Sequence, residues 1–328
     1  MDLTQGAPQG CEATTSFLHT ESKVEPTWLE VPMPWYAKVL SWLLSLAQLP
    51  HSVALVPDGN RRWAKQRAAP LYEGHIRGVF NIQKFQAAAI ALGILQSSVY
   101  AFSVRNLMRP EDQKRYIFNI MGVIAGNIIK NWELYQKKRW SVMIPGDVDL
   151  LSDDVRKRIA TAELLTHQTR AEAQIFYAAS YSSQHQMSRM ALTLCHAVKE
   201  GLLEPRDITA SLIDRYIEIE DGPMIDCYLR TSGERRLSDF MTWQSERAAI
   251  YFLTKNFPDF VLLDMFKMML HYSAPSSSRK RLEDCYLKVR NRTERRFSVA
   301  QRLKERKFQS WLEAKRQAHL RLLAGSDH

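Results

Sequence analysis

Short apolar runs alternate with longer amphipathic stretches along most of the chain. Such runs, rich in β-branched and aromatic residues, are typical of buried strands, whereas the stretches between them have helical spacing of their apolar residues. Strands that alternate with helices favour a mostly parallel sheet with helices on both faces. We therefore predict an α/β fold with a six-stranded sheet. Its strands are expected at 51–56, 98–103, 140–144, 173–180, 224–230 and 249–253.

The helices are predicted from apolar residues that recur every three or four positions between the strands. Glycine and proline interrupt this pattern, as Gly93 and Pro275 do, and mark where a helix is expected to end. The expected helices are a short one after Asn60, then 79–92, 111–136, 150–166, 184–200, 208–217, 240–248 and 261–272, followed by a long basic helix after Ser278.

The same pattern divides the chain into four parts. Residues 1–30 are polar and aperiodic, so we expect a disordered tail. Residues 31–50 contain a strongly apolar helix that is shorter than the roughly 20 residues needed to span a bilayer. This helix either packs on the main domain or lies in a membrane interface with its aromatic residues at headgroup level. Residues 51–274 are the expected main domain, and residues 275–328 are a basic helical tail.

Formal charge is distributed unevenly along the chain. The net charge is +10, and residues 279–321 hold 15 Lys and Arg against 5 Asp and Glu, which leaves 30 of each elsewhere. A basic tail on a neutral body indicates contact with anionic lipid or with an acidic partner. Nucleic acid is an alternative partner. The few aromatic residues of the tail lack the spacing of a recognition motif, so we expect no nucleic-acid partner.

A polar cluster follows most of the expected strands, and the first contains Asp58, Asn60 and Arg62. Because open α/β sheets bind ligands where the carboxyl ends of their strands meet, we expect these clusters to form one site. An acid beside arginines fits a diphosphate bound through Mg²⁺, with Asp58 as metal ligand. The alternative is an ordinary turn in which Asn60 caps a helix. The other clusters are Ser103-Asn106-Arg109, Gly146-Asp147, Ser180-Tyr181 and Arg230-Arg236-Ser238.

Several of these clusters resemble known motifs. The stretch Asp58-Gly-Asn-Arg-Arg-Trp-Ala-Lys65 resembles the signature of cis-prenyltransferases, and its Asn-Arg-Arg form is similar to the eukaryotic dehydrodolichyl diphosphate synthase branch. Tyr100-Ala-Phe-Ser-x-x-Asn106-x-x-Arg109-Pro resembles the second motif of that family. Arg230-Thr-x-Gly-Glu-x-Arg236-x-Ser238-x-Phe240 resembles its diphosphate-binding motif. The resemblance extends from His51 to Asp259, and it makes residues 51–274 the expected catalytic domain.

The resemblance implies roles for particular residues. Asp58 would bind Mg²⁺, and Arg230, Arg236 and Ser238 would hold the diphosphate of isopentenyl diphosphate. The residues implied for the allylic diphosphate are Gly59, Asn60, Arg61 and Arg62, with His75 beside them. The residues implied near the reacting centre are Ser103, Asn106 and Arg109.

Structural alternatives remain open for some of these residues. His75 is equally compatible with a packed, hydrogen-bonded histidine, and Arg109 could cap a helix before Pro110. Asp147 could simply make a turn. Glu234 could pair with Arg230 or Arg236.

The chain departs from the family pattern at several positions. Arg105 stands where the second motif usually has Glu, and Leu71 replaces an arginine usual near the allylic site. Ala249 occupies the position of a metal-binding Glu in bacterial members. An Arg-x-Gly segment that completes the partner's site in homodimeric members is also missing, since the nearest match is Arg295-Arg-Phe-Ser298. These departures leave a non-catalytic subunit as the alternative function.

The resemblance also implies substrates, a partner and a location. A member of this branch adds isopentenyl diphosphate units to farnesyl diphosphate and makes long Z-polyprenyl diphosphate for dolichol synthesis and protein glycosylation. It pairs with a catalytically silent subunit, related to the Nogo-B receptor, on the cytosolic face of the endoplasmic reticulum membrane. The growing product needs an apolar tunnel, expected between helices at 80–92 and 117–129.

Overall fold

The structure of this chain is a computed structural model that describes residues 35–168, 170–274, 281, 284–286, 288 and 298–325. The predicted tail 1–30 and the start of the segment after Ala274 lie outside these residues. A single six-stranded sheet runs through the molecule in the order β3-β4-β2-β1-β5-β6, and every strand pairing is parallel. The predicted α/β fold is therefore confirmed. The strands are β1 Ser52–Val56, β2 Gln96–Tyr100, β3 Trp140–Met143, β4 Ala173–Ala178, β5 Cys227–Arg230 and β6 Ala249–Phe252.

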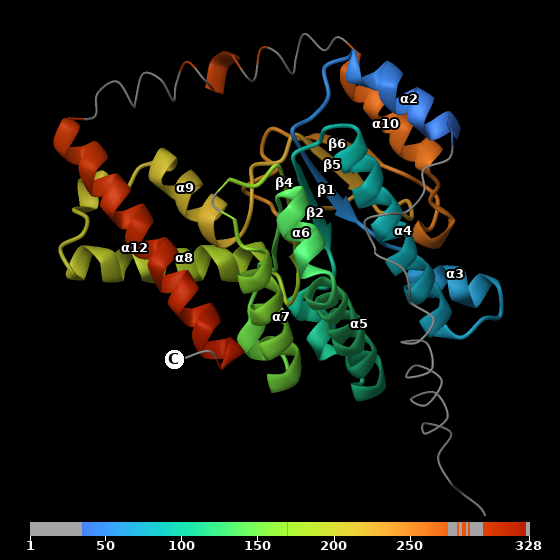
Figure 1. Cartoon of the computed structure of the whole chain (residues 1–328), viewed down its shortest axis with the longest axis horizontal. Coiled ribbons are helices and arrows are strands. Elements are labelled where there is room, and N and C mark those ends of the chain that lie inside the picture. Colours follow the sequence, from blue (N-terminus) through green and yellow to red (C-terminus); the bar gives the residue numbers. More distant parts are fainter. Residues whose placement is uncertain are drawn as a thin grey trace, which may run out of the picture.

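Helices connect the strands and cover both faces of the sheet (Figure 1). The α-helices are α2 Trp35–Ser45, α3 Asn60–Gln66, α4 Leu71–Ala91, α5 Glu111–Lys130, α6 Trp132–Lys138, α7 Asp153–Thr166, α8 Ser183–Lys199, α9 Ala210–Glu220, α10 Leu262–Ser273 and α12 Val299–Ala324. Short 3-10 turns lie at η1 Val104–Met108, η2 Val148–Leu150, η3 Pro205–Asp207 and η4 Phe257–Asp259.

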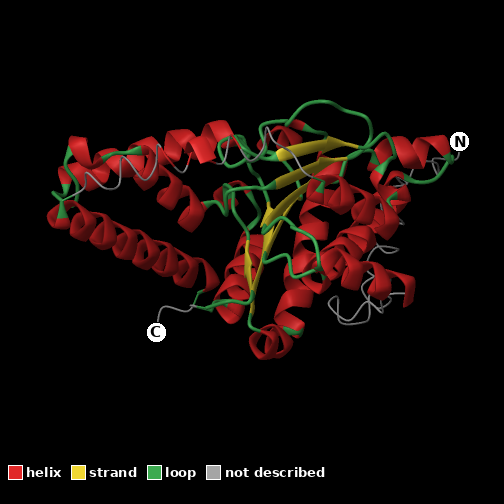
Figure 2. Cartoon of the chain, turned by 90° about the horizontal axis from the view of Figure 1, so that it is seen from above, coloured by secondary structure: helices red, strands yellow, loops and turns green. Residues whose placement is uncertain are grey.

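The two faces of the sheet pack against different cores. Alternate strand residues such as Leu55, Val99 and Leu229 are fully buried against α4, α5 and α10. On the opposite face, Tyr228 of β5 is buried under Phe240, which belongs to the chain that follows β5. Figure 2 shows helices on both sides of the sheet, with α12 on the side away from α4 and α5. Because both faces of the sheet are covered, β1 and β5 are buried at every position.

Two predicted helices are wrong as stated. The pattern at 111–136 forms two helices, because the chain breaks at Asn131, which has φ −112° and ψ 17°. The segment 240–248 forms turns instead of a helix. Its Phe240 ring stacks on Tyr100 with ring centroids 4.4 Å apart, and Met241 adopts a φ of +47°. Tertiary packing of a buried aromatic ring therefore overrides the helical spacing of this segment.

Other predicted boundaries shift by a few residues, as is usual at element ends. β2 was predicted at 98–103 and is observed at Gln96–Tyr100. It therefore begins two residues earlier and ends three residues earlier than predicted. The largest shift is that of α4, which begins at Leu71 and so includes Gly74 and Gly78. A Cβ on either glycine would lie within 3 Å of Asn60, the first residue of α3. His75 therefore lies on a helix and not in a loop.

The helix α2 lies beside α10 (Figure 1). It buries Ser41 and Leu44, while Trp35, Trp42 and Leu46 are mostly exposed. Among the described residues, no helix combines the length and apolar character that crossing a membrane requires. The helix thus presents one apolar face to the protein and another to its surroundings.

Candidate active site

The loop after β1 has a conformation that requires glycine. The Asp58 N–H donates to Thr231 Oγ1 at 2.9 Å, and the Asp58 carboxylate accepts the Gly59 N–H at 2.7 Å. Gly59 has a φ of +97°, and a Cβ there would lie 2.4 Å from Asn256 Oδ1. Any other residue would meet both backbone strain and a clash. The Asp-Gly pair is therefore held in place by the loops that follow β5 and β6.

Arg230 joins the first and fifth polar clusters. It ends β5 opposite Val56 of the neighbouring β1, so its side chain reaches the Asp58 loop. One guanidinium nitrogen donates to Asp58 Oδ2 at 2.7 Å, and the other donates to Ser238 Oγ at 2.5 Å. The arginine is only 4% exposed. A buried charge with two polar partners from separate motifs is held in one orientation.

Glu234 links two further arginines of the site. Its carboxylate lies 3.2 Å from Arg62 Nη1 and 2.5 Å from Arg236 Nη1. Arg62 also lies 3.5 Å from Asp58. The predicted pairing of Glu234 with Arg236 is therefore seen, and Arg62 is its second partner. This chain of ion pairs brings the residues predicted for the two diphosphates next to one another.

The loop after β2 supplies a third group of side chains. The Ser103 N–H donates to Asn106 Oδ1 at 3.1 Å, which holds the amide inside the η1 turn. Arg109 lies close enough to Arg61 that burial and this second positive charge lower the pKa of Arg109. The Asp58 carboxylate acts in the opposite direction on the same guanidinium. The structure therefore brings Arg61, Arg109 and Asp58 together at one edge of the sheet.

His75 is a packed, hydrogen-bonded histidine that also lies near two arginines of the site. Its Nδ1 lies 2.9 Å from the Leu71 carbonyl, as expected for a packed helical histidine. Burial lowers the pKa of His75, and the nearby charges of Arg109 and Arg61 lower it further. The imidazole therefore lies beside the arginine cluster and is neutral at pH 7. A neutral imidazole can donate or accept one hydrogen bond there.

Two buried polar atoms of the site have no hydrogen-bond partner, namely Asn60 Oδ1 and Arg230 Nε. Buried polar atoms are normally satisfied, so these two atoms are free to take part in binding at the site. Arg61 and Arg109 form no ion pair with any carboxylate among the described residues. The site thus has the arginine side chains and the Arg230 Nε donor available for an anion, whereas the Asn60 Oδ1 acceptor would need a donor or a cation.

The donor set also fits Mg²⁺ held largely by a substrate. Asp58 is the carboxylate at the centre of the site, and its side chain is 30% exposed. The described residues contain no group of three or more His, Cys, Asp or Glu side chains that could hold a metal alone. Mg²⁺ is commonly bound by one or two carboxylates together with substrate phosphates. Asp58 meets that requirement next to the arginines.

Tyr100 and Thr231 belong to the site, although the sequence analysis assigned them no role. The Tyr100 hydroxyl lies 3.3 Å from the carbonyls of Tyr181 and Ser238, and burial raises its pKa to about 12. Thr231 accepts the Asp58 N–H and donates to the Asp58 carbonyl at 2.9 Å. Both residues belong to the quoted motifs and stand at the ends of strands. That position was the signal by which the sequence could have identified them as site residues.

Two residues singled out by the sequence lie away from Asp58. Asp147 pairs with His185 at 3.3 Å, at the end of the sheet formed by β3 and β4. Ala249 pairs with Cys227 at the amino end of β6, whereas Arg230 lies opposite Phe252 at the carboxyl end. Three residues of strand separate these ends by about 10 Å. Position 249 therefore lies at the opposite end of β6 from the residue that pairs with Arg230.

Comparisons with known proteins identify the family of this chain. The family model for putative undecaprenyl diphosphate synthase matches residues 56–281. The human dehydrodolichyl diphosphate synthase complex subunit DHDDS is 30% identical over 251 residues, which cover 76% of this chain and 75% of the human protein. Ditrans,polycis-undecaprenyl-diphosphate synthase of Vibrio parahaemolyticus is 33% identical over 212 residues, 65% of this chain and 83% of the bacterial one.

A solved structure shares the architecture as well. The crystal structure of lavandulyl diphosphate synthase from Lavandula x intermedia, in complex with dimethylallyl diphosphate, superimposes with a TM-score of 0.64 at 28% identity. The match covers 70% of this chain and 97% of that protein. The motif resemblance, the family model and the shared fold lead to one assignment. This chain belongs to the undecaprenyl diphosphate synthase family and is a cis-prenyltransferase.

Proposed function

We propose that this chain is the catalytic subunit of a dehydrodolichyl diphosphate synthase. It would add isopentenyl diphosphate units to farnesyl diphosphate and make a long Z-polyprenyl diphosphate for dolichol synthesis and protein glycosylation. The observation that carries the proposal is the buried Arg230, which contacts both Asp58 and Ser238. One side chain thereby connects the two motifs that the family uses for its two diphosphates.

Each diphosphate has its own set of donors in this proposal. Gly59, Asn60, Arg61 and Arg62 would hold the allylic diphosphate beside His75. Arg230, Arg236 and Ser238 would hold the diphosphate of isopentenyl diphosphate. The side chain of Arg236 is 62% exposed and so is accessible to an incoming anion. Glu234 would exchange its pairs with Arg62 and Arg236 for their contacts to phosphate.

The reaction breaks the C1–O bond of the allylic substrate and releases diphosphate. The terminal double-bond carbon of isopentenyl diphosphate bonds to C1, and loss of a proton from its C2 forms the new Z double bond. Positive side chains fixed beforehand around the leaving diphosphate stabilise its growing charge. Mg²⁺ held by Asp58 would supply further neutralisation of that charge. Ser103, Asn106 and Arg109 would orient the reacting centre.

The product would leave between α4 and α5. The residues 80–92 and 117–129 of these helices contribute Phe85, Met121 and Ile124 to the main apolar core. An apolar passage between them would keep a growing isoprenoid out of water. α4 begins at Leu71, the position where the family usually has an arginine. The apolar lining would therefore extend to that position.

A partner and a membrane surface complete the proposal. The human relative is named a complex subunit, and the Arg-x-Gly segment of homodimeric members is missing from this chain. We propose a Nogo-B receptor-like partner that supplies it, on the cytosolic face of the endoplasmic reticulum. The exposed Trp35 and Trp42 of α2, with Leu46 just after its end, favour contact with lipid at that surface.

The decisive experiment measures incorporation of labelled isopentenyl diphosphate onto farnesyl diphosphate with Mg²⁺, with and without the partner. Long product that requires the partner and disappears in Asp58→Ala would support the proposal. Equal activity of the chain alone would overturn the partner requirement. A folded chain that adds nothing to the activity of the complex would instead indicate the alternative, a non-catalytic subunit silenced by Arg105 and Leu71.

A further inference from the structure

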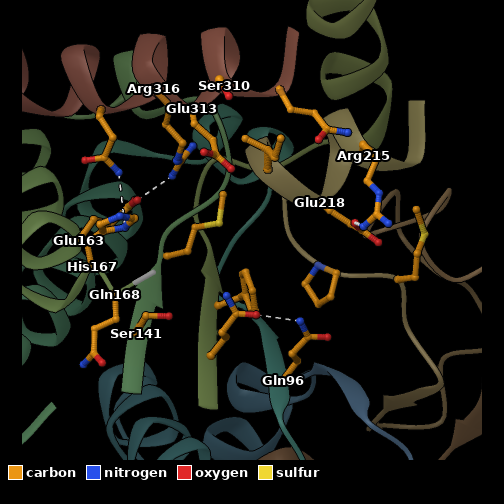
Figure 3. Close-up of a pocket in the computed structure, with 18 of the residues that line it drawn as sticks. Gln96, Ser141, Glu163, His167, Gln168, Arg215, Glu218, Ser310, Glu313 and Arg316 are labelled. Atoms are coloured by element: carbon orange, nitrogen blue, oxygen red, sulfur yellow. Dashed lines mark hydrogen bonds and ion pairs between the residues drawn. The ribbon is translucent and has the colours of Figure 1, made fainter. Parts of the chain in front are cut away.

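The helix α12 lies beyond the segment matched by the family model, yet it packs against the main domain. It contacts α7 and α9. It also lines one side of a cleft of about 1510 Å³ at the amino-end half of the sheet. Figure 3 shows this cleft, with Arg316 and Glu313 of α12 facing Glu163 of α7. None of the residues that line the cleft belongs to α4 or α5, so it is distinct from the proposed product passage.

Arg316 is the charged anchor of α12. Its guanidinium lies 2.6 Å from Glu163 Oε2 and 3.7 Å from Glu220 Oε2, and it donates to the Glu220 carbonyl at 3.3 Å. Glu163 is 5% exposed, and the Arg316 side chain is 17% exposed. Buried carboxylates need such a counter-charge, because removal of one partner leaves the other uncompensated.

The first arm of the network continues from Glu163 to the end of β3. The second carboxylate oxygen of Glu163 accepts the Ile144 N–H at 2.9 Å. Ile144 follows β3 directly and lies two residues before Gly146. A single glutamate therefore connects α12 with the polar loop that follows β3.

The second arm reaches the same loop from α9. Asp221, next to Glu220, is fully buried and accepts Arg189 Nη2 at 2.7 Å. The other terminal nitrogen of Arg189 donates to the Gly146 carbonyl at 3.3 Å. The segment 144–146 is thus held on one side by Glu163 and on the other by Arg189.

This segment is in tight contact with the next loop of the sheet edge. Gly146 has a φ of +135°, and a Cβ there would lie 1.8 Å from the Ala179 carbonyl. Ala179 donates to Pro145, and Asp147 donates to Ser180. A shift of the segment 144–147 would therefore displace the loop after β4.

The loop after β4 in turn contacts the active site. The Val104 N–H donates to the Tyr181 carbonyl at 3.2 Å, and Ser103 forms a parallel bridge with Tyr181. The same Tyr181 carbonyl accepts the Tyr100 hydroxyl. Hydrogen bonds joined by short stretches of backbone therefore connect α12 with the loop that carries Ser103 and Asn106.

We propose that Arg316 is a positioning residue for prenyl transfer, acting through Glu163 and the 144–147 segment on the loop of Ser103 and Asn106. The proposal rests on the role proposed above for those two residues. Arg316 touches no substrate. It fixes the distance between the basic carboxyl-terminal helix and one edge of the active site.

The test compares Arg316→Met with Arg321→Met in the full chain with its partner. Arg321 is an exposed arginine in the last turn of the same helix, so it controls for loss of charge. We expect Arg316→Met to raise amide hydrogen exchange in peptides covering 100–108 and 142–150. We also expect kcat to fall by about 10- to 100-fold, with smaller changes in both KM values, because misplaced groups near the reacting centre slow the chemical step. Arg321→Met should change neither.

Several outcomes separate positioning from mere stability. A lower melting temperature with unchanged kcat and unchanged exchange at these peptides would overturn the proposal. If Arg316→Met does not fold, Arg316→Lys keeps the charge but loses the forked contact. It should show the same changes in weaker form, and wild-type behaviour of this variant would overturn the proposal. Raised exchange in a chain whose wild type has no activity would support the mechanical link and overturn the proposed function instead.

Discussion

The two ends of the sheet are both rich in arginine, but they use it differently. At the amino end, Arg316 lies between Glu163 and Glu220, and Arg215 pairs with Glu218 at 2.7 Å. At the carboxyl end, Arg230 pairs with Asp58 and Arg62 pairs with Glu234, but Arg61 and Arg109 form no ion pair to a carboxylate among the described residues, although each charge acts on the other.

The difference separates structural charge from binding charge. Paired arginines satisfy their partners, and their removal costs stability. Adjacent arginines repel each other in the free protein, so an anion that lies between them gains from both. The buried Asn60 Oδ1 without a partner occurs at the same end. Arginines without a carboxylate partner among the described residues therefore mark the site more clearly than the number of charges does.

The largest effect is expected from Arg230→Met. The substitution leaves Asp58 and Ser238 without their shared partner and should lower kcat/KM by about 10³. Steady-state incorporation of labelled isopentenyl diphosphate measures the loss, and a melting curve tests folding. The matched variants are Arg235→Met, exposed in the same loop, and Arg215→Met at the amino end. A comparable loss in Arg215→Met would contradict the distinction between the two ends.

A smaller effect is expected from Gly59→Ala. Its control is Gly93→Ala, because Gly93 also has a positive φ, +76°, but lies before β2 with nothing within 4 Å of its Cβ position. Backbone strain should cost about 1–2 kcal/mol in both variants. Gly59→Ala should lose more stability, since its Cβ meets Asn256, and should lose activity about 100-fold. Chemical denaturation and the incorporation assay would test this, and equal losses in the two variants would sink the clash argument.

The smallest effect concerns His75 and pH. Burial and the neighbouring arginines lower the pKa of His75 below its ordinary value of 6.5. Above pH 6.5 the histidine is neutral in both states. Below it the unfolded chain binds a proton that the folded chain does not, so the free energy of unfolding falls as pH is lowered.

In His75→Gln the free energy of unfolding should decline less steeply as pH is lowered. The difference from the wild type should be smaller than the free energy lost in Gly93→Ala. The control His319→Gln removes an exposed histidine of α12 and should leave the slope unchanged. Denaturation at several pH values between 8 and 5 measures both. An unchanged slope in His75→Gln would show that burial and the neighbouring arginines do not lower the pKa of His75.

Much of the site could be predicted because its residues stand at strand ends. The apolar runs before Pro57 and Thr231 fixed which residues follow a buried strand, and parallel strands put those residues at one edge. The helix predicted at 240–248 was wrong, because its periodicity does not reveal that Phe240 inserts among Tyr100, Tyr181 and Tyr228. Spacing along the chain reports which face is apolar but not which partner covers it.

The sequence by itself determined the alternation of strands and helices, the polar loops after the strands and the family motifs within them. These features are local, since they depend on side-chain period and turn chemistry over a few residues. Only the tertiary structure decided that β1 lies between β2 and β5, which brings Arg230 to Asp58 across 172 positions. It also decided that Arg316 is paired and Arg109 is not. Pairing of charges depends on which distant segments pack together, and that is set by burial of the whole core.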